Sequence, residues 1–348
     1  MTAHDPRAVQ AGVIRRLLHP LARFYEDQSL FEIIINRPGE LFVEGHGGWS
    51  RHEVPEITFD SLMSFAKAVA TFSAQKIDPT SPVLSATLPE GERIQIVMPP
   101  AVTAGTVSVT VRKPSQVTFG LDELHASGLF DDVVEAGSEV SANDRELERL
   151  YAARSWHEFL ALAVRTRKNI LISGATGSGK TTLSKALIAH IPKDERIITI
   201  EDTPELVIPQ PNHVRLYYSK GGQGQARIGA KELLESCLRM RPDRILLQEL
   251  RDGTAFYYIR NVNSGHPGSI TTVHADSAAL AFEQLTLLVK ESEGGQNLER
   301  DDIRELLRLL VDIVVQCKRV NGRFRITEIY YRSAGDTRGT DPTAGITR

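Results

Sequence analysis

The spacing of apolar residues divides the chain into two parts. In the first part, short segments carry apolar residues at alternate positions or in short runs, which is the pattern of β-strands. Residues 58–74 instead have the spacing of an amphipathic helix. The pattern predicts an α+β domain with a sheet over residues 1–115. The predicted strands are LFEIIIN (30–36), GELFVEG (39–45), ERIQIVMPP (92–100) and TVSVTVRKP (106–114).

The second part, residues 151–333, alternates apolar runs with helical segments. Strands that alternate with helices indicate an α/β fold with a parallel sheet core. Asn321 and Gly322 separate the last two runs, so these runs predict a closing hairpin. The runs are NILISG (169–174), RIITIED (196–202), DRILLQE (243–249), SITTVHA (269–275), DIVVQCKRV (312–320) and RFRITEIYYRS (323–333), and the helical segments are 230–240, 253–263, 278–290 and 300–310.

Two segments have no core pattern of their own. Residues 116–150 carry 2 basic against 9 acidic residues, which predicts an acidic linker with a short helix or two. Residues 334–348 are rich in Gly, Thr and Asp, and we expect a disordered tail there.

The N-terminal segment predicts a basic amphipathic helix. Val9, Val13, Leu17 and Leu21 lie on one side of it, and Pro20 must kink or restart it. Such a helix either packs on its own domain or touches an anionic membrane surface or a partner.

Composition narrows the class of protein. A chain of 348 residues with 41% hydrophobic and 24% charged residues is typical of a globular protein large enough for two domains. There is no apolar run of about 18 residues and no signal-peptide pattern, so we expect a cytosolic location. The net charge of -3, without a dense basic stripe, argues against constitutive DNA binding. Cys237 and Cys317 fit no zinc spacing and are expected to be reduced packing residues.

The segment NILISGATGSGKTTLSKAL (169–187) contains the pattern G-x-x-x-x-G-K-[ST] of a phosphate-binding loop. Its glycines let backbone N–H groups surround an anion, and the following helix points its N-terminal dipole at the same place. Lys180 adds a positive charge, and the Thr181 hydroxyl can bind Mg²⁺. We therefore expect ATP or GTP binding with Mg²⁺. The expected nucleotide contacts are Gly174, Ala175, Thr176, Gly177, Ser178, Gly179, Lys180, Thr181 and Thr182.

The ends of three predicted strands offer groups for chemistry on that nucleotide. Glu201 and Asp202 follow one apolar run, Glu249 follows the next, and His274 follows a third. In a doubly wound sheet the carboxyl ends of strands line the ligand crevice, so these side chains could face the phosphates. Acids there can activate water or hold a metal, and an imidazole can sense the γ-phosphate.

Phosphoryl transfer also commonly uses an arginine, from the same chain or from a neighbouring subunit. Arg93 and Arg112 lie in strands of the first domain, whereas Arg239, Arg241 and Arg251 lie in the second. From the spacing alone, each of these arginines is expected to be a surface charge.

Four motifs in order resemble those of the secretion ATPase superfamily, most closely the hexameric traffic ATPases of type IV secretion systems. GATGSGKTT resembles the Walker A loop, TIEDTPEL the aspartate box, CLRMRPDRILLQELRDGTAF the Walker B region and SGHPGSITTVHA the histidine box. PEGERIQIV and VSVTVRKPS resemble the end of the N-terminal domain, so the resemblance covers nearly the whole chain. It implies a RecA-like P-loop domain with a mainly parallel sheet, preceded by a smaller α+β domain.

The resemblance also implies roles for individual residues. Lys180, Thr181 and Thr182 would hold the phosphates and Mg²⁺, and Glu249 would be the Walker B acid that helps to bind the metal. Glu201 would orient or activate water.

Three further residues would complete the ATPase site. His274 would couple γ-phosphate occupancy to conformation, and Arg93 and Arg112 would reach the nucleotide from the N-terminal side. The family forms a homo-hexameric ring on the cytoplasmic face of the inner membrane, where it works with other secretion-system components. Its ATP hydrolysis drives the transfer of protein or DNA, or pilus assembly.

Some alternatives stay open. Gln248 stands where the family often has glycine, so the path of the backbone before Glu249 is not fixed by the resemblance. Either Glu201 or Glu249 could be the base. The long linker allows the N-terminal domain to pack on its own subunit or on the next.

Three alternative functions stay open. They are a pilus or competence motor, a P-loop phosphotransferase and a nucleotide-stabilised docking scaffold. The two lone cysteines cannot form the tetracysteine zinc module common in type II secretion ATPases.

Overall fold

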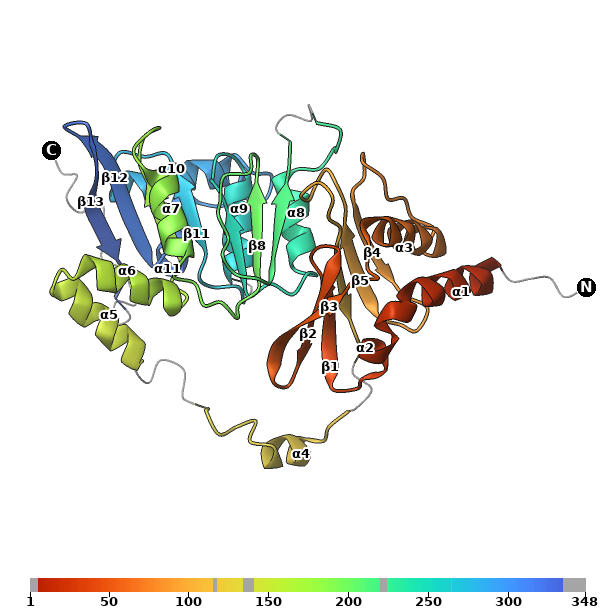
Figure 1. Cartoon of the computed structure of the whole chain (residues 1–348). Coiled ribbons are helices and arrows are strands. Elements are labelled where there is room, and N and C mark those ends of the chain that lie inside the picture. The colour runs from red at the N-terminus through yellow and green to blue at the C-terminus, as the bar shows by residue number, and fades with distance from the viewer. Residues whose placement is uncertain (1–5, 115–117, 134–140, 220–223, 264, 334–348) are drawn as a thin grey trace, which may run out of the picture.

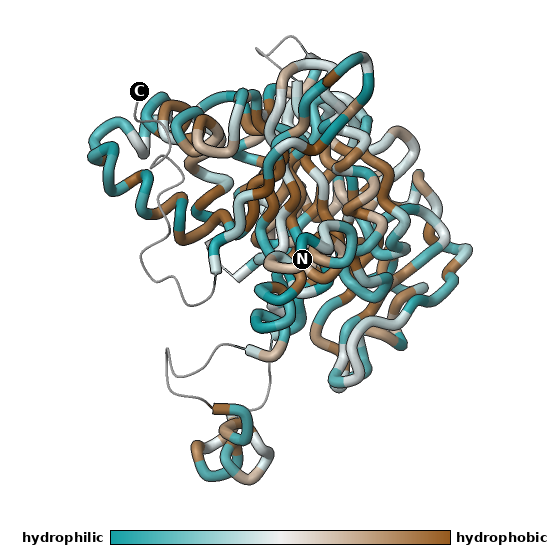
Figure 2. The backbone as a smooth tube through the Cα atoms, turned by 90° about the vertical axis from the view of Figure 1, so that its left-hand side faces the viewer, coloured by the Kyte–Doolittle hydropathy of each residue, from teal (hydrophilic) through white to brown (hydrophobic). Residues whose placement is uncertain are grey.

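The structure is a computed structural model that describes residues 6–114, 118–133, 141–219, 224–263 and 265–333. Two domains lie side by side, and a long connection that carries α4 joins them (Figure 1). Apolar backbone segments gather in the interior of both domains, and hydrophilic segments lie mostly at the periphery (Figure 2). The expected disordered tail, 334–348, lies outside the described residues.

The N-terminal domain is built on an antiparallel sheet of six strands in the order β3-β2-β1-β6-β5-β4. One face of the sheet is covered by α3, Phe59–Phe72, which Thr58 caps by accepting a hydrogen bond from Ser61 N at 3.1 Å. The strands are β1 Leu30–Ile35, β2 Gly39–Gly45, β3 Gly48–Val54, β4 Val83–Thr87, β5 Arg93–Val97 and β6 Ser108–Arg112.

Pro20 interrupts the N-terminal helical segment as the sequence predicts. Helix α1 ends at Leu18, a 3₁₀ turn (η1) covers His19–Leu21, and α2 covers Ala22–Glu26. The predicted apolar side was wrong in part, because Val9 and Val13 of α1, Pro6–Leu18, are 53% and 47% exposed. The side of α1 that packs against α3 is instead the side that carries the buried Ile14.

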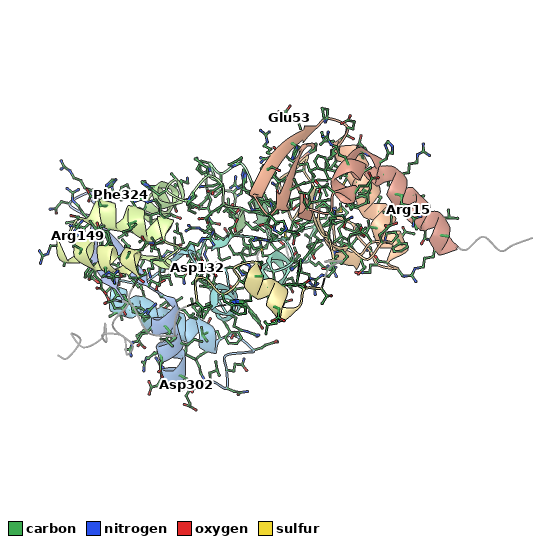
Figure 3. All side chains as sticks on the ribbon, turned by 90° about the horizontal axis from the view of Figure 1, so that it is seen from below. Arg15, Glu53, Asp132, Arg149, Asp302 and Phe324 are labelled. Carbon is green, nitrogen blue, oxygen red and sulfur yellow. The ribbon has the colours of Figure 1, made fainter. Side chains whose placement is uncertain are left out.

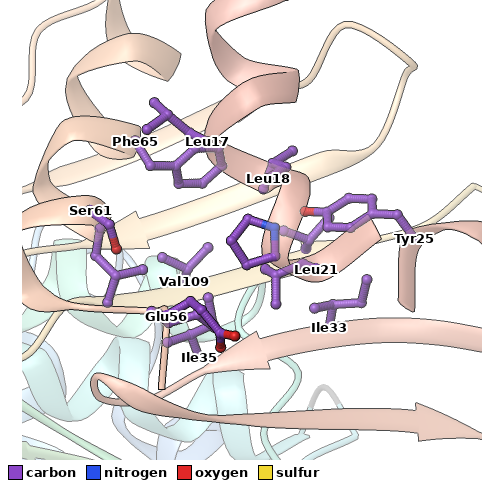
Figure 4. A pocket seen from close by; sticks show the side chains of 14 residues that line it. Leu17, Leu18, Leu21, Tyr25, Ile33, Ile35, Glu56, Ser61, Phe65 and Val109 are labelled. Carbon is purple, nitrogen blue, oxygen red and sulfur yellow. The ribbon is translucent and has the colours of Figure 1, made fainter. Parts of the chain in front are cut away.

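A small apolar cavity remains where these helices meet the sheet (Figure 4). It has a volume of about 40 Å³ and lies between Leu17, Leu21 and Phe65 on the helices and Ile33 and Val109 on the sheet. This space suits little more than a water molecule, so the N-terminal helices are an integral part of the domain core.

The C-terminal domain has the predicted α/β fold. A parallel sheet β10-β8-β9 adjoins a sheet β11-β7-β12-β13, in which only the last pair is antiparallel. The two sheets meet where Leu250 N donates to Thr272 O at 2.8 Å. The strands are β7 Ile170–Ser173, β8 Ile197–Glu201, β9 His213–Tyr217, β10 Arg244–Leu247, β11 Ile270–Val273, β12 Ile313–Val320 and β13 Arg323–Tyr331. The helices are α6 Trp156–Arg165, α7 Lys180–Ile188, α8 Ala230–Cys237, α9 Thr254–Asn263, α10 Ala278–Lys290 and α11 Arg300–Leu310.

The closing hairpin is confirmed. Strands β12 and β13 pair in an antiparallel register around Asn321 and Gly322, whose φ angles of 50° and 76° suit a two-residue hairpin turn. The two cysteines are confirmed as buried and unpaired.

A buried polar network joins the two domains. The Arg196 guanidinium is fully buried and donates to Asn36 Oδ1 at 2.7 Å and to Asn212 Oδ1 at 2.6 Å. Asn36 belongs to the N-terminal domain and the other two to the C-terminal domain. Val102 also forms a β-bridge with Leu216. The N-terminal domain therefore packs on the β9 edge of the C-terminal sheet within one chain.

The linker contains α4, Leu121–Ala126, and α5, Ala142–Ala152. Helix α4 has no buried residue and stands apart from both domains in Figures 1 and 2. In the described ranges, no helix combines the length and the apolar character needed to span a bilayer.

Candidate active site

The loop between β7 and α7 has the geometry of a phosphate-binding loop. Gly179 has a φ angle of 95° directly before the first residue of α7, a conformation that favours glycine. A side chain on Gly174 would lie 2.4 Å from the Cys317 carbonyl oxygen, so only glycine fits there. Ala175, Thr176 and Gly177 are exposed. The loop thus opens toward solvent at the N-terminus of a helix.

Lys180 lies inside this loop. Its ammonium group donates to the carbonyl oxygens of Gly174 at 2.8 Å and Ala175 at 3.1 Å, and it lies 3.4 Å from His274 Nδ1. Burial lowers the pKa of Lys180, and the nearby Glu249 partly offsets this effect. An anion in the loop would give this buried cation a charged partner.

A chain of polar contacts continues from Lys180. Because an ammonium group can only donate, His274 Nδ1 accepts, and Nε2 of the same ring lies 2.8 Å from Glu249 Oε1. The other Glu249 oxygen pairs with Arg251, which also donates to Asp202 Oδ2 at 2.9 Å. Three predicted site residues, on three different elements, are therefore brought together.

Burial affects the charge of the acid in this group. Burial raises the pKa of Glu249, while His274 and Lys180 oppose the rise. A carboxylate with a raised pKa beside a phosphate loop is well placed to exchange a proton with water.

Glu201 has a different environment from Glu249. It is fully buried, and both of its carboxylate oxygens are already engaged. Oε1 accepts from Thr199 Oγ1 at 2.7 Å, and Oε2 accepts from the backbone N–H groups of Glu205 and Leu206 at 2.9 Å each. Arg215 donates to both oxygens at 3.0 and 2.9 Å. These five bonds fill the lone-pair sites of the carboxylate, so Glu201 has none left for a water molecule.

Arg93 and Arg112 lie away from the phosphate loop of their own chain. They are cross-strand partners on β5 and β6 and line a cleft of about 670 Å³ together with Arg239, Arg241 and the nearly buried Glu32. Among the described residues, no hydrogen bond or ion pair joins either arginine to the loop. The chain therefore does not bring these two predicted residues to the site.

Comparison with known proteins explains this arrangement of motifs. Residues 17–343 match the model of the family described as "Type II/IV secretion system protein". The chain belongs to this family. It is a secretion ATPase with the RecA-like fold of that family.

Several relatives of this secretion ATPase are similar over almost their whole length. The type IV secretion system protein VirB11 of Bartonella quintana is 61% identical over 331 residues, which is 92% of this chain and 93% of the relative. The protein of the same name from Brucella suis is 45% identical over 315 residues, 89% and 87% of the two chains. The solved structure of the Brucella suis VirB11 ATPase, in complex with sulphate, has a TM-score of 0.88 and 43% identity, and the match covers 93% of this chain and 96% of that one.

The structure settles how Gln248 fits a secretion ATPase. Its N–H donates to Ile200 O at 3.0 Å, and its carbonyl oxygen accepts from Thr272 Oγ1 at 3.1 Å. The strand pairing therefore continues through Gln248, and Glu249 still reaches His274. The glycine common elsewhere in the family is not needed for this backbone path.

Sequence reasoning missed the part played by Arg251 and Asp202. The sequence places Asp202 at a strand end without a specific role, and it predicts Arg251 to be a surface charge. Their contact joins residues 49 positions apart. The one local signal was that Arg251 stands two residues after Glu249.

The arginine cleft predicts a pH-dependent stability. Burial raises the pKa of Glu32 to about 7, although Arg112, 3.6 Å away, opposes the rise. Below the unfolded value of 4.5 both states are protonated, and Glu32 has no effect on stability. Between pH 4.5 and about 7 the unfolded chain loses this proton while the folded protein still holds it, so stability falls across that range, and the loss is complete above about pH 7. Glu32→Gln should therefore match the wild type at pH 4 and be about 3 kcal/mol more stable at pH 8.

Urea unfolding at several pH values measures this difference. Glu53→Gln, on the exposed surface of β3, is the matched control and should show no change with pH relative to the wild type. An equal effect of Glu32→Gln at pH 4 and pH 8 would contradict the prediction.

Proposed function

We propose that this secretion ATPase is a Mg²⁺-dependent ring that hydrolyses ATP at the Lys180 loop and powers type IV secretion. The observation that carries the proposal is the chain of contacts from Lys180 through His274 to Glu249. It connects the group that would hold the phosphates to the acid that would act on water. ATP is the substrate in this proposal, and the loop residues Gly174 to Thr182 bind it.

Lys180 and His274 would report nucleotide binding. The Lys180 ammonium group has three donors, and in the structure all three point to protein atoms. A phosphate in the loop takes at least one of these donors. Since His274 is the longest of the three contacts, it is the first to be released, and its ring is then free to turn toward the γ-phosphate. Nucleotide occupancy thereby changes the position of His274 and, through it, of Glu249.

Two residues would hold Mg²⁺. Thr181 is exposed in the first turn of α7, and Glu249 follows β10 by two residues. Both are oxygen donors of the kind that Mg²⁺ prefers, and a pair of protein ligands is usual for this ion. When bound, Mg²⁺ neutralises charge on the phosphate oxygens. No cluster of three or more metal-binding side chains occurs in the described segments, which suits an ion held mainly by phosphate and water.

Between the two acids, Glu249 is the better candidate for the base. Its side chain is only 12% exposed, it lies 2.8 Å from His274 Nε2, and burial raises its pKa. Glu201 instead would hold the β8–β9 region together through Arg215 and two backbone N–H groups. We assign Glu201 a positioning role at the site.

Arg93 and Arg112 would serve the nucleotide of a neighbouring subunit. They lie in an open cleft that four arginines and Glu32 line, and the Arg196 network fixes the domain that carries them. In a six-membered ring this cleft can face the phosphate loop of the next subunit. The proposal places the ring at the cytoplasmic face of the inner membrane, where secretion-system components dock and protein or DNA is transferred. The exposed Val9 and Val13 of α1 offer a peripheral membrane contact.

Steady-state ATP hydrolysis per subunit, measured against protein concentration, tests whether the active sites are completed by assembly of a ring. Activity should rise with concentration, because assembly completes each site, and Arg112→Ala should lower it by about 10³-fold. Lys113→Ala, the adjacent cation, is the control and should have a much smaller effect. Activity that is independent of concentration and unchanged by Arg112→Ala would leave a monomeric enzyme.

Mixing two inactive variants shows whether Arg112 acts between subunits. Lys180→Ala subunits retain the arginine, and Arg112→Ala subunits retain the loop. If the arginine acts in trans, mixed rings contain intact sites and recover part of the activity. If it acts in cis, every subunit in the mixture lacks one required group, and the mixture stays inactive.

A further inference from the structure

Phe324 is an exposed aromatic residue at the edge of the phosphate loop. Its side chain is 57% exposed, although a large apolar ring is normally buried. It comes from β13, more than 140 residues after the loop, and Figure 3 labels it at the C-terminal-domain end of the molecule, far from Arg15. Nothing in the chemistry assigned above uses it.

The ring lies against the loop itself. The atoms Cβ, Cγ and Cδ1 of Phe324 are 3.2 to 3.4 Å from the place that a Cβ on Gly179 would occupy. Gly179 immediately precedes Lys180, so the ring lies beside the backbone that would surround the phosphates. A side chain at Gly179 would crowd the ring.

The strand order decides which end of a nucleotide would lie near Phe324. The order is β11-β7-β12-β13, with β10 next to β11 on the far side. Glu249 and His274 follow β10 and β11, so the γ-phosphate lies on that side of the loop. The remainder of the nucleotide must leave on the other side, where β12 and β13 form the wall. The only part of ATP that can reach beyond the α-phosphate in that direction is the nucleoside.

We propose that Phe324 stacks on the purine base of the nucleotide held by the Lys180 loop and is a specificity-determining residue of this ATPase. Stacking on a purine would cover the exposed face of the ring. Arg319 is the cross-strand partner of Phe324 and therefore lies on the same face of the hairpin, where it adds a cation beside the base. This inference rests on the proposed nucleotide site.

Equilibrium titration of the full-length protein with MgADP and with magnesium pyrophosphate separates the base from the phosphates. Phe324→Ala should weaken ADP binding roughly 10-fold and leave pyrophosphate binding unchanged, because only ADP carries a base. Phe324→Trp and Phe324→Tyr should restore tight ADP binding. Ile326→Ala removes another exposed apolar side chain from the same face of the hairpin and should change neither constant.

Three outcomes would overturn the assignment. If Phe324→Ala weakens the binding of both ligands equally, the Phe324 side chain shapes the loop and does not contact the base. If neither dissociation constant changes, the base lies elsewhere. If ADP binding of Phe324→Ala recovers fully when the protein concentration is raised, Phe324 is a contact between subunits. Failure of the nucleotide site itself looks different, because the wild type would then bind neither ligand at the Lys180 loop, and Lys180→Ala would change nothing.

Discussion

Replacing Lys180 by alanine should reduce ATP turnover by at least about 10²–10³-fold while the protein remains folded. The ammonium group of Lys180 lies within the loop, where it is bonded to two loop carbonyls and to His274. Its removal takes away the charge that would stabilise the transferred phosphoryl group. It also disconnects the loop from Glu249, so two parts of the mechanism fail together.

The fold should tolerate this change. Burial lowers the pKa of Lys180, which means that the folded protein holds this cation at a cost. Thermal unfolding should therefore be nearly unchanged. Lys185→Ala, five residues further along α7, removes the same charge and should retain turnover. Near-normal hydrolysis by Lys180→Ala would remove the loop from the mechanism.

The grouping of Lys180, Glu249 and His274 could be predicted from sequence because it depends on local order. Gly174, Gly179 and Lys180 are fixed by the turn from a strand into a helix. Glu249 and His274 each follow a short apolar run, and parallel strands bring their ends to one edge. The closing hairpin could also be predicted from the sequence, since Asn321 and Gly322 adopt positive φ angles at low cost in free energy.

Some strands could not be predicted. Strand β3 is mostly exposed, so the sequence GWSRHEV shows no apolar periodicity. Strands β4 and β9 are short, and their alternation is too brief to separate them from loops. These strands exist because of pairing with neighbours, and that pairing is decided by the whole sheet.

Long-range polar partners were also beyond the sequence. The contacts of Arg196 join residues 160 and 16 positions away, and no spacing rule predicts such pairs. The same is true of Glu201 and Arg215. A strand-end acid next to a phosphate loop reads as catalytic, and only the three-dimensional structure shows that an arginine on the adjacent strand already engages it.

Replacing the two glutamates separately should give opposite results. Glu249→Gln should lose turnover about 10²–10⁴-fold, because an amide cannot take a proton, and should unfold like the wild type. Glu201→Gln should lower the free energy of unfolding by about 3–5 kcal/mol, because it leaves the Arg215 guanidinium without its counter-charge beside a fully buried site. Urea unfolding and ATP turnover on the same samples measure both effects.

A double variant identifies the cause of the Glu201 effect. Glu201→Leu with Arg215→Met removes both charges and should recover part of the lost stability, because no uncompensated charge remains. Recovery of stability should bring back a corresponding part of the turnover if Glu201 only positions the site. A stable Glu201→Gln protein with no turnover would instead make Glu201 the base, and the five hydrogen bonds around it would then have to break before each cycle of hydrolysis.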